Sequence, residues 1–246
     1  MAIVPDGTSS PGPELRAEFD LKRVNEDLVK RLKGERASED DAMSTAIGGS
    51  FDLVGRMQLS LLRHYGLMPD GYLIDVGCGA GRLAQPLSRY LKGPYLGIDL
   101  VGELVDYARR TTDRPDWKFQ VIDHIGIPER DGRADMVCFF SVLTHLLHEH
   151  SYWYLEEAKR VLKPGGRIVA SFLEFRDAGH WSIFESSLVN AKAGIRNPLN
   201  VFMDREGIMT WSNYLGLKIE EIRSGFDVIV PEGAIGQSLF VYSKPL

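Results

Sequence analysis

A glycine-rich turn that follows a short apolar run constrains the fold of this 246-residue chain more than any other feature. The run Tyr72–Ile74 leads into Asp75, and glycines then stand at the alternate positions 77, 79 and 81. Glycine is used where the backbone takes a positive φ or lies against a ligand with no Cβ in the way. The helical pattern of Arg82–Leu91 follows, and free N–H groups at its start would face that ligand. The segment therefore predicts a strand, a ligand-binding loop and a helix.

The spacing of the glycines distinguishes two classes of ligand. The dinucleotide-binding pattern Gly-x-Gly-x-x-Gly, counted from Gly77, requires glycine at position 82, where this chain has Arg82. Gly77, Gly79 and Gly81 form Gly-x-Gly-x-Gly instead. The carboxylate of Asp75 would repel a pyrophosphate but could accept a hydrogen bond from an ammonium group. The turn favours a zwitterionic amino-acid ligand, and an NAD-dependent oxidoreductase is the alternative from another class.

Three further apolar runs lie near acidic residues. Tyr95–Ile98 ends at Asp99, the place where nucleoside-binding sheets carry an acid that accepts both ribose hydroxyl protons. Trp117–Ile122 ends at Asp123, and Met136–Phe140 is preceded by Asp135. Asp99 as a helix N-cap and Asp123 as a plain turn residue are the structural alternatives.

The alternation of strand and helix patterns continues to the end of the chain. A helix over Tyr152–Leu162 precedes a fifth strand over Arg167–Phe172, and a last helix over Met203–Leu215 precedes strands over Leu217–Ile222 and Gln237–Ser243. Such alternation predicts an α/β fold, a doubly wound seven-stranded, mostly parallel sheet with helices on both faces. Ligands then gather at the carboxyl ends of the strands.

In order and spacing, residues 51–172 resemble the class I S-adenosylmethionine-dependent methyltransferases, which have a Rossmann-like fold. The resemblance implies a cofactor, S-adenosylmethionine, with Asp99 on its ribose and Asp123 on its adenine. It implies an antiparallel seventh strand and a turn at Lys163–Gly166 that stops the preceding helix before the fifth strand. The implied cofactor-binding residues are Asp75, Gly77, Gly79, Gly81, Asp99, Leu100, Asp123, His124 and Ser141.

The segment before the first strand folds over the cofactor in similar methyltransferases. Arg56 lies in that segment and could pair with the carboxylate of the cofactor's methionine moiety. An exposed helix arginine is the alternative.

The loop after the fourth strand supplies the candidate catalytic residue. Methyl transfer is an in-line displacement in which positioning carries much of the rate, but a hydroxyl acceptor also needs a base. His145 is the predicted general base, and a histidine that hydrogen-bonds the next helix start is the alternative. His148 and His150 raise the question of a metal site, but the acidic ligands of a Mg²⁺ site are missing from this strand end, so none is predicted.

The acceptor predicted from these residues is a hydroxyl of a small metabolite or sugar. The loop after the fourth strand does not carry the Asn-Pro-Pro-Tyr or Asp-Pro-Pro-Tyr sequence of the family's nucleobase- and glutamine-methylating members. The aromatic-rich segment Phe172–Phe184 could stack on a sugar or ring. A nitrogen or carbon acceptor is the alternative within the class, and a non-catalytic cofactor-binding partner subunit is a further one.

The chain divides into an N-terminal region, 1–50, and a methyltransferase domain, 51–246, with a cap insertion at about 173–201. Pro5–Pro13 is predicted to be disordered, and Glu14–Lys33 to form an amphipathic helix. This helix is expected to pack on its own domain, and a homodimer formed through it is the alternative.

Composition and the first residues indicate which binding partners and which cellular compartment to expect for the protein. A formal charge of −5 and a pI near 5.7 argue against a nucleic-acid substrate, and the longest apolar run is too short to span a membrane. The first residues have no secretory pattern, which predicts a cytoplasmic protein with Cys78 and Cys138 as reduced core thiols.

Overall fold

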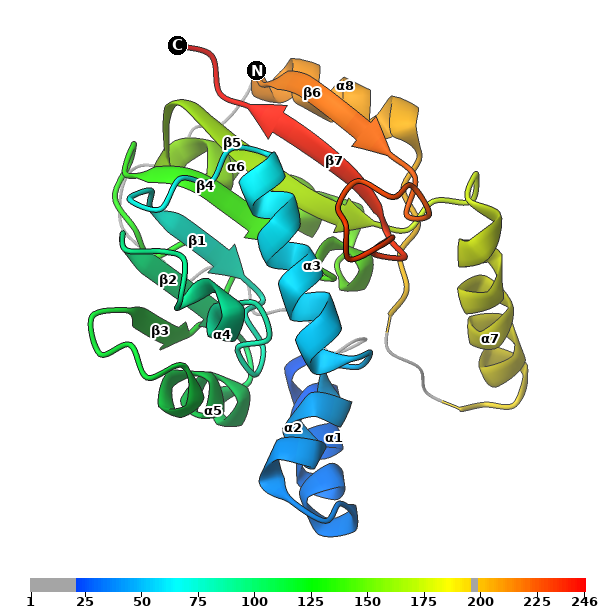
Figure 1. The fold of residues 1–246 in the computed structure, drawn as a ribbon. Helices are drawn as coiled ribbons and strands as arrows, with labels where there is room; N and C mark the ends of the chain where they lie inside the picture. The colour runs from blue at the N-terminus through cyan, green and yellow to red at the C-terminus, as the bar shows by residue number, and fades with distance from the viewer. Residues whose placement is uncertain (1–20, 196–198) are drawn as a thin grey trace, which may run out of the picture.

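The computed structural model describes residues 21–195 and 199–246 and contains one seven-stranded sheet in the order β3-β2-β1-β4-β5-β7-β6 (Figure 1). Strands β1 to β5 run parallel, and β7 is antiparallel to β5 and β6. The predicted α/β class and the antiparallel last strand are confirmed. The strands are β1 (Leu73–Val76), β2 (Tyr95–Asp99), β3 (Lys118–Val121), β4 (Ala134–Phe139), β5 (Leu162–Phe172), β6 (Lys218–Arg223) and β7 (Ser238–Ser243).

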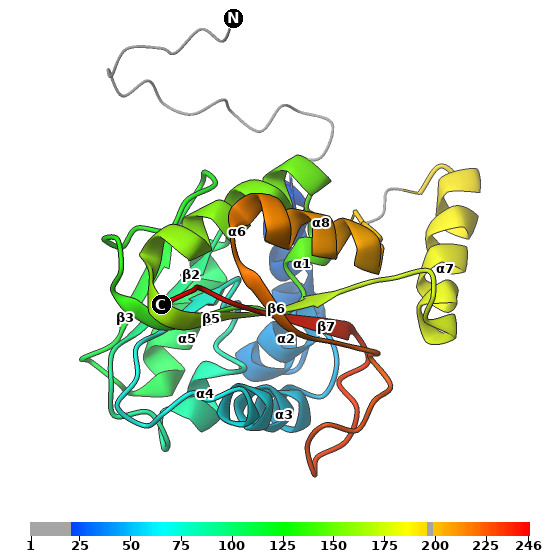
Figure 2. The ribbon, with the colours of Figure 1, turned by 90° about the horizontal axis from the view of Figure 1, so that it is seen from above.

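Helices cover both faces of the sheet, as Figure 2 shows from above. Successive residues of a strand point to opposite faces, so Leu73 packs with one set of helices and Ile74 with the other. Among the described helices, none combines the length and the apolar composition needed to cross a bilayer. One face carries α3 (Phe51–His64), α4 (Ala84–Leu87) and α5 (Gly102–Thr112), and the other carries α6 (His148–Val161) and α8 (Arg205–Leu215).

Two N-terminal helices, α1 (Leu21–Glu35) and α2 (Glu39–Ala46), pack on the start of α5. Val29 and Met43 are buried there against Leu104. The expected packing on the chain's own domain is therefore confirmed, and dimerisation through α1 stays a prediction. The predicted disorder of residues 5–13 and the start of the predicted helix lie outside the described residues.

The helix predicted over Arg82–Leu91 is wrong in length, since only α4, Ala84–Leu87, forms within it. Pro86 has no N–H to bond the carbonyl of Arg82. That carbonyl instead lies against Gly55 of α3, where an added Cβ would stand 2.3 Å from its oxygen.

The turn predicted at Lys163–Gly166 is part of β5, which begins directly after α6. Gly165 has a φ of 77° and donates its N–H to the carbonyl of Lys244 at 2.8 Å. The C-terminal segment therefore holds these residues as an extension of the strand, with a register shift against β4.

The predicted insertion holds a short 3₁₀ turn, η2 (Ala178–His180), and helix α7 (Trp181–Lys192). Figures 1 and 2 both show α7 standing apart from the sheet. None of its residues is buried.

The contact of Gly55 with Arg82 predicts a specific loss of stability. Gly55→Ala should lower the free energy of unfolding by about 1–3 kcal/mol, because a backbone carbonyl would have to move. Thermal and urea unfolding measure it. Gly34→Ala in α1 is the matched control, since its Cβ would meet nothing within 4 Å and alanine favours the helix by up to about 1 kcal/mol. Equal stabilities for the two variants would contradict this account.

Candidate active site

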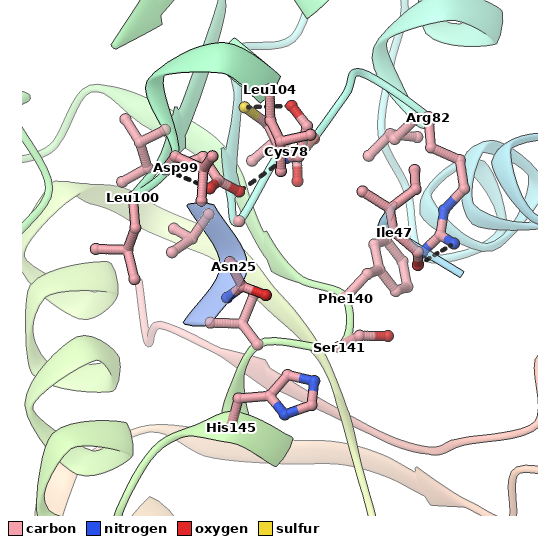
Figure 3. Close-up of a pocket in the computed structure, with 18 of the residues that line it drawn as sticks. Asn25, Ile47, Cys78, Arg82, Asp99, Leu100, Leu104, Phe140, Ser141 and His145 are labelled. Carbon is pink, nitrogen blue, oxygen red and sulfur yellow. Dashed lines mark hydrogen bonds between the residues drawn. The ribbon is translucent and has the colours of Figure 1, made fainter. Parts of the chain in front are cut away.

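One cavity lies at the carboxyl ends of β1, β2 and β4, and helices α1 and α3 contribute to its wall (Figure 3). In that view Asp99 and Cys78 lie at one end, and Ser141 and His145 lie at the other. The polar lining residues are Asn25, Gln58, Asp75, Arg82, Asp99, Ser141, His145 and Tyr154, and the backbone of Gly77 and Gly79 completes them.

The glycine turn has the backbone that its sequence predicts. Gly77 has a φ of 75°, and a Cβ on it would stand 2.3 Å from the Val142 side chain. Gly79 also has a positive φ, 51°, and lines the cavity. Gly81 does not line it: with a φ of 81° it packs on α5, where a Cβ would come within 3.0 Å of Ala108.

Asp99 uses one carboxylate oxygen to bind this turn and the other to bind the segment after β2. Oδ2 accepts the Gly79 N–H at 2.9 Å, and Oδ1 accepts the Val101 N–H at 3.0 Å next to the start of α5. Burial raises the pKa of Asp99, and these backbone donors oppose that shift. Each carboxylate oxygen keeps a further lone pair, so the group can accept two more hydrogen bonds. Two adjacent hydroxyls of a ribose fit that capacity.

Asp75 is a buried carboxyl beneath the turn. It accepts hydrogen bonds from the Tyr95 hydroxyl at 2.8 Å and the Cys138 thiol at 3.4 Å. Burial raises the pKa of Asp75 to about 6, while these two donors and Arg82 oppose the shift. At neutral pH the group is mainly ionised, which leaves a buried negative charge in a cavity wall. A cationic ligand group would stabilise it.

Gln58 of α3 is a functional candidate that the sequence patterns did not single out. Its side chain lines the cavity, is only 3% exposed, and its Oε1 has no hydrogen-bond partner among the described residues. A buried, unpaired amide oxygen costs free energy that a ligand N–H would recover. Gln58 follows Gly55 by three residues and therefore lies on the same helix face, toward Arg82.

Arg82 also faces the cavity and ties it to the N-terminal helices. Its Nη1 donates to the Gly48 carbonyl at 2.9 Å, just beyond α2. Arg56, the arginine predicted from the sequence, is exposed and is not part of the lining. The structure thus places a different arginine near the glycine turn.

His145 lies in a short 3₁₀ turn, η1 (Leu143–His145), after β4. Its Nδ1 is 2.6 Å from the carbonyl oxygen of Leu199, which can only accept a hydrogen bond. Nδ1 therefore carries the proton in the neutral ring, and Nε2 is left as the acceptor. His148 binds a different carbonyl, that of Phe202, so the two rings do not converge on one point.

The remaining predicted residues divide between the cavity and the surface. Leu100 and Ser141 line the cavity, and Ser141 has an unusual φ of 60° for a residue with a side chain. Asp123 and His124 pair with each other at the surface, with side chains 77% and 67% exposed, and neither lines the cavity. Their contact with a cofactor stays a prediction that this geometry does not support.

Tyr154 of α6 is a further residue of the cavity wall, whereas Asp123, which was predicted to contact adenine, does not line the cavity. The ring lines the wall with Leu100 and Ile122, and burial together with the charge of Asp99 raises the pKa of its hydroxyl. The hydroxyl therefore stays protonated and can donate. A helix residue that points back over the sheet has no sequence signal that separates it from plain core.

Comparison with known proteins agrees with this geometry. Residues 74–170 match a family model described as a methyltransferase domain. Over 136 residues the chain is 31% identical to a malonyl-[acyl-carrier protein] O-methyltransferase of Hahella chejuensis, covering 52% of this chain and 47% of that protein. It is 26% identical over 161 residues to a ubiquinone biosynthesis O-methyltransferase of Xylella fastidiosa, covering 61% and 62%. The matches thus span about half to three fifths of these two relatives.

Solved structures show the same fold at low sequence identity. A putative methyltransferase of Haloferax volcanii, solved with the Trm112 methyltransferase activator, has a TM-score of 0.64 at 18% identity and covers 94% of this chain and 100% of its own. The magnesium protoporphyrin IX methyltransferase of Synechocystis has a TM-score of 0.59 at 15% identity, with 91% and 96% covered. The chain therefore carries a methyltransferase domain, residues 74–170, in the fold of the class I S-adenosylmethionine-dependent methyltransferases.

Proposed function

We propose that this protein transfers a methyl group from S-adenosylmethionine to a hydroxyl group of a small metabolite or sugar, with His145 as general base. One observation carries the proposal: a single cavity holds the glycine turn bound by Asp99 at one end and a histidine with an accepting Nε2 at the other. Both curated relatives described above are named as O-methyltransferases. The net charge of −5 favours a small acceptor over a nucleic acid.

The cavity residues fit the three parts of the cofactor. The free lone pairs of Asp99 would accept the ribose hydroxyls, and the wall of Leu100, Ile122 and Tyr154 would hold the adenine. The buried charge of Asp75 and the unpaired oxygen of Gln58 would accept the ammonium group of the methionine moiety.

The guanidinium of Arg82 supplies positive charge in the same wall for the methionine carboxylate. When bound, the cofactor supplies a methyl group activated by its sulfonium charge.

The chain's own contribution to the reaction is positioning and proton removal. Nε2 of His145 would take the hydroxyl proton of the acceptor, and the Leu199 carbonyl would stabilise the imidazolium that results, because Nδ1–H already donates to it. Asn25 of α1 and Ala46 of α2 line the cavity and would limit the access of water on that side.

Cofactor choice is tested by isothermal titration calorimetry with S-adenosylmethionine and with NADH. We expect binding of S-adenosylmethionine only, and a loss of about tenfold or more in affinity for Asp99→Asn, since a charged acceptor for two hydroxyls is removed. Asp123→Asn is the matched control and should bind normally, because that side chain lies at the surface. Tight NADH binding without S-adenosylmethionine binding would refute the proposal.

The role of His145 is tested with the variant His145→Ala. Turnover of a hydroxyl acceptor should fall by about 10²–10⁴-fold with unchanged cofactor affinity, and added imidazole should restore part of it. His148→Ala, in the first turn of α6, should keep most of the activity. An amine acceptor that His145→Ala still methylates at the full rate would instead establish nitrogen methylation.

The buried carboxyl predicts a pH dependence of cofactor binding. Asp75 titrates near pH 6, and its neutral form offers no charge to an ammonium group, so the dissociation constant for S-adenosylmethionine should rise as the pH falls below about 6. The limit is about tenfold per pH unit. Calorimetry between pH 5 and 8 measures it. Asp75→Asn should bind weakly and lose this dependence, and a constant affinity for the wild type over this range would contradict the assignment.

A further inference from the structure

Hydrogen bonds next to the cavity connect Ser141 with Ser171 and with Gln237 in the C-terminal part of the chain. The Ser141 N–H donates to the Ser171 hydroxyl at 2.8 Å. The carboxamide Oε1 of Gln237, which directly precedes β7, lies 2.6 Å from the Ser171 hydroxyl and 3.2 Å from the Ser141 hydroxyl. Three segments that are far apart in sequence thus meet next to the cavity.

The directions of these hydrogen bonds fix the orientation of the Gln237 carboxamide. The Ser171 hydroxyl oxygen accepts a hydrogen bond from the Ser141 N–H. The hydroxyl proton of Ser171 can be donated to Gln237 Oε1 at 2.6 Å or to the Phe139 carbonyl at 3.5 Å, and the shorter distance favours Gln237. The oxygen of the amide is thereby held toward the two serines. Within residues 21–195 and 199–246, its nitrogen makes no hydrogen bond. Two N–H donors of Gln237 therefore remain available next to Ser141, which lines the cavity.

An aromatic cluster, defined here as Phe175, Trp181, Phe184 and Phe202, lies in the insertion. Phe175 and Phe202 stack with centroids 4.3 Å apart, and Phe184 packs edge-on against both. Phe175 and Trp181 are nevertheless 56% and 47% exposed. Aromatic rings that pack together and still face solvent form a surface that is favourable for an apolar ligand.

Two sets of hydrogen bonds to backbone carbonyls connect this cluster to the segments that carry His145 and Gln237. On one side, His145 donates to the carbonyl of Leu199. Val201, which directly precedes Phe202 of the cluster, donates its N–H to the Thr144 carbonyl at 2.8 Å. On the other side, His180 directly precedes Trp181 of the cluster, and its Nε2 donates to the carbonyl of Gly236 at 3.2 Å. Gly236 is the neighbour of Gln237 in the sequence. The cluster is therefore held by the segments that hold the base and the free amide.

The composition of α7 favours an apolar compound over a carbohydrate. Its only charged residues are Glu185 and Lys192, and Leu188 and Val189 are exposed. The carboxylate of Glu185 accepts from the Trp181 indole at 2.8 Å. Leu188 follows Phe184 by about one helical turn, so an exposed aliphatic side chain lies on the same side of α7 as this ring. Such a surface suits an alkyl, prenyl or aryl group, whereas sugar hydroxyls would need polar partners.

We propose that Gln237 and the aromatic cluster form the acceptor site, and that the acceptor carries its reactive hydroxyl beside a second oxygen on an apolar body. The Gln237 amide would donate to the second oxygen, and the apolar body would lie on Phe175 and Trp181. This inference rests on the proposed function, of which it specifies the substrate class.

Methylation of three matched probes by the full chain tests it: 4-nonylcatechol, 4-nonylphenol, which has no second oxygen, and catechol, which has no apolar chain. The wild type should show a kcat/KM for 4-nonylcatechol about tenfold or more above that for each of the others. Gln237→Met should lose the preference over 4-nonylphenol, and Trp181→Ala the preference over catechol. Both should keep the wild-type affinity for S-adenosylmethionine. Trp153→Ala, an exposed tryptophan of α6, is the control and should keep both preferences.

Equal rates for the three probes, or variants that leave both preferences intact, would overturn the inference. Where no probe is methylated, calorimetry of 4-nonylcatechol against the S-adenosylhomocysteine complex decides: binding that Trp181→Ala weakens supports the site, and no binding refutes it. Methyl glucoside is added as a carbohydrate probe. If it alone is methylated, the proposed function stands and the acceptor class inferred here is wrong. Failure to bind S-adenosylmethionine would be a failure of the proposed function itself.

Discussion

The carboxylate of Asp99 is the group on which the site depends. It joins the glycine turn after β1 to the segment after β2, because one oxygen accepts from Gly79 and the other from Val101. The parallel pairing of β1 with β2 brings these two strand ends to one edge. A left-handed glycine backbone and a buried acid are each costly alone. Together they satisfy the Gly79 N–H of the turn and leave carboxylate lone pairs on a residue that lines the cavity.

Several polar groups of the cavity are left under-satisfied by the protein itself. The Gln58 amide oxygen has no partner among the described residues, and burial opposes ionisation of the Asp75 carboxyl. Such groups lower the stability of the unliganded protein and strengthen the binding of a ligand that supplies the matching donors. Arg82 connects the same wall to the backbone after α2, so the N-terminal helices are positioned by the residues that would hold the cofactor. Stability and cofactor binding are thus coupled at this edge of the sheet.

The sequence was sufficient for features that depend on neighbouring residues. The positive φ of Gly77 and Gly79 and the position of Asp99 at the end of β2 were predicted correctly, since a strand, a turn and an acid after the next strand form a local pattern. Their contact with a cofactor stays a prediction. The exposure of Arg56 could not be predicted from its neighbours in the sequence. Successive residues of a helix point in directions that differ by about 100°. The face of α3 that carries Gly55 packs on Arg82, and this tertiary contact decides that Gln58 is buried and Arg56 exposed.

Residues brought in from distant segments were beyond the sequence patterns. Asn25 and Tyr154 reach the cavity from helices whose packing is set by tertiary contacts, and Gln237 meets Ser171 across 66 positions. Asp123 had the expected position after β3, yet its side chain lies at the surface. A strand end places a residue near the ligand edge but does not determine the direction of its side chain.

A crystal structure of the protein with S-adenosylhomocysteine at saturating concentration tests the central claim most directly. The account predicts density for the nucleoside with both ribose hydroxyls within hydrogen-bond distance of the Asp99 carboxylate, and with His145 Nε2 facing the sulfur end of the cavity. Density for the ligand at another place, or ribose hydroxyls turned away from Asp99, would contradict it.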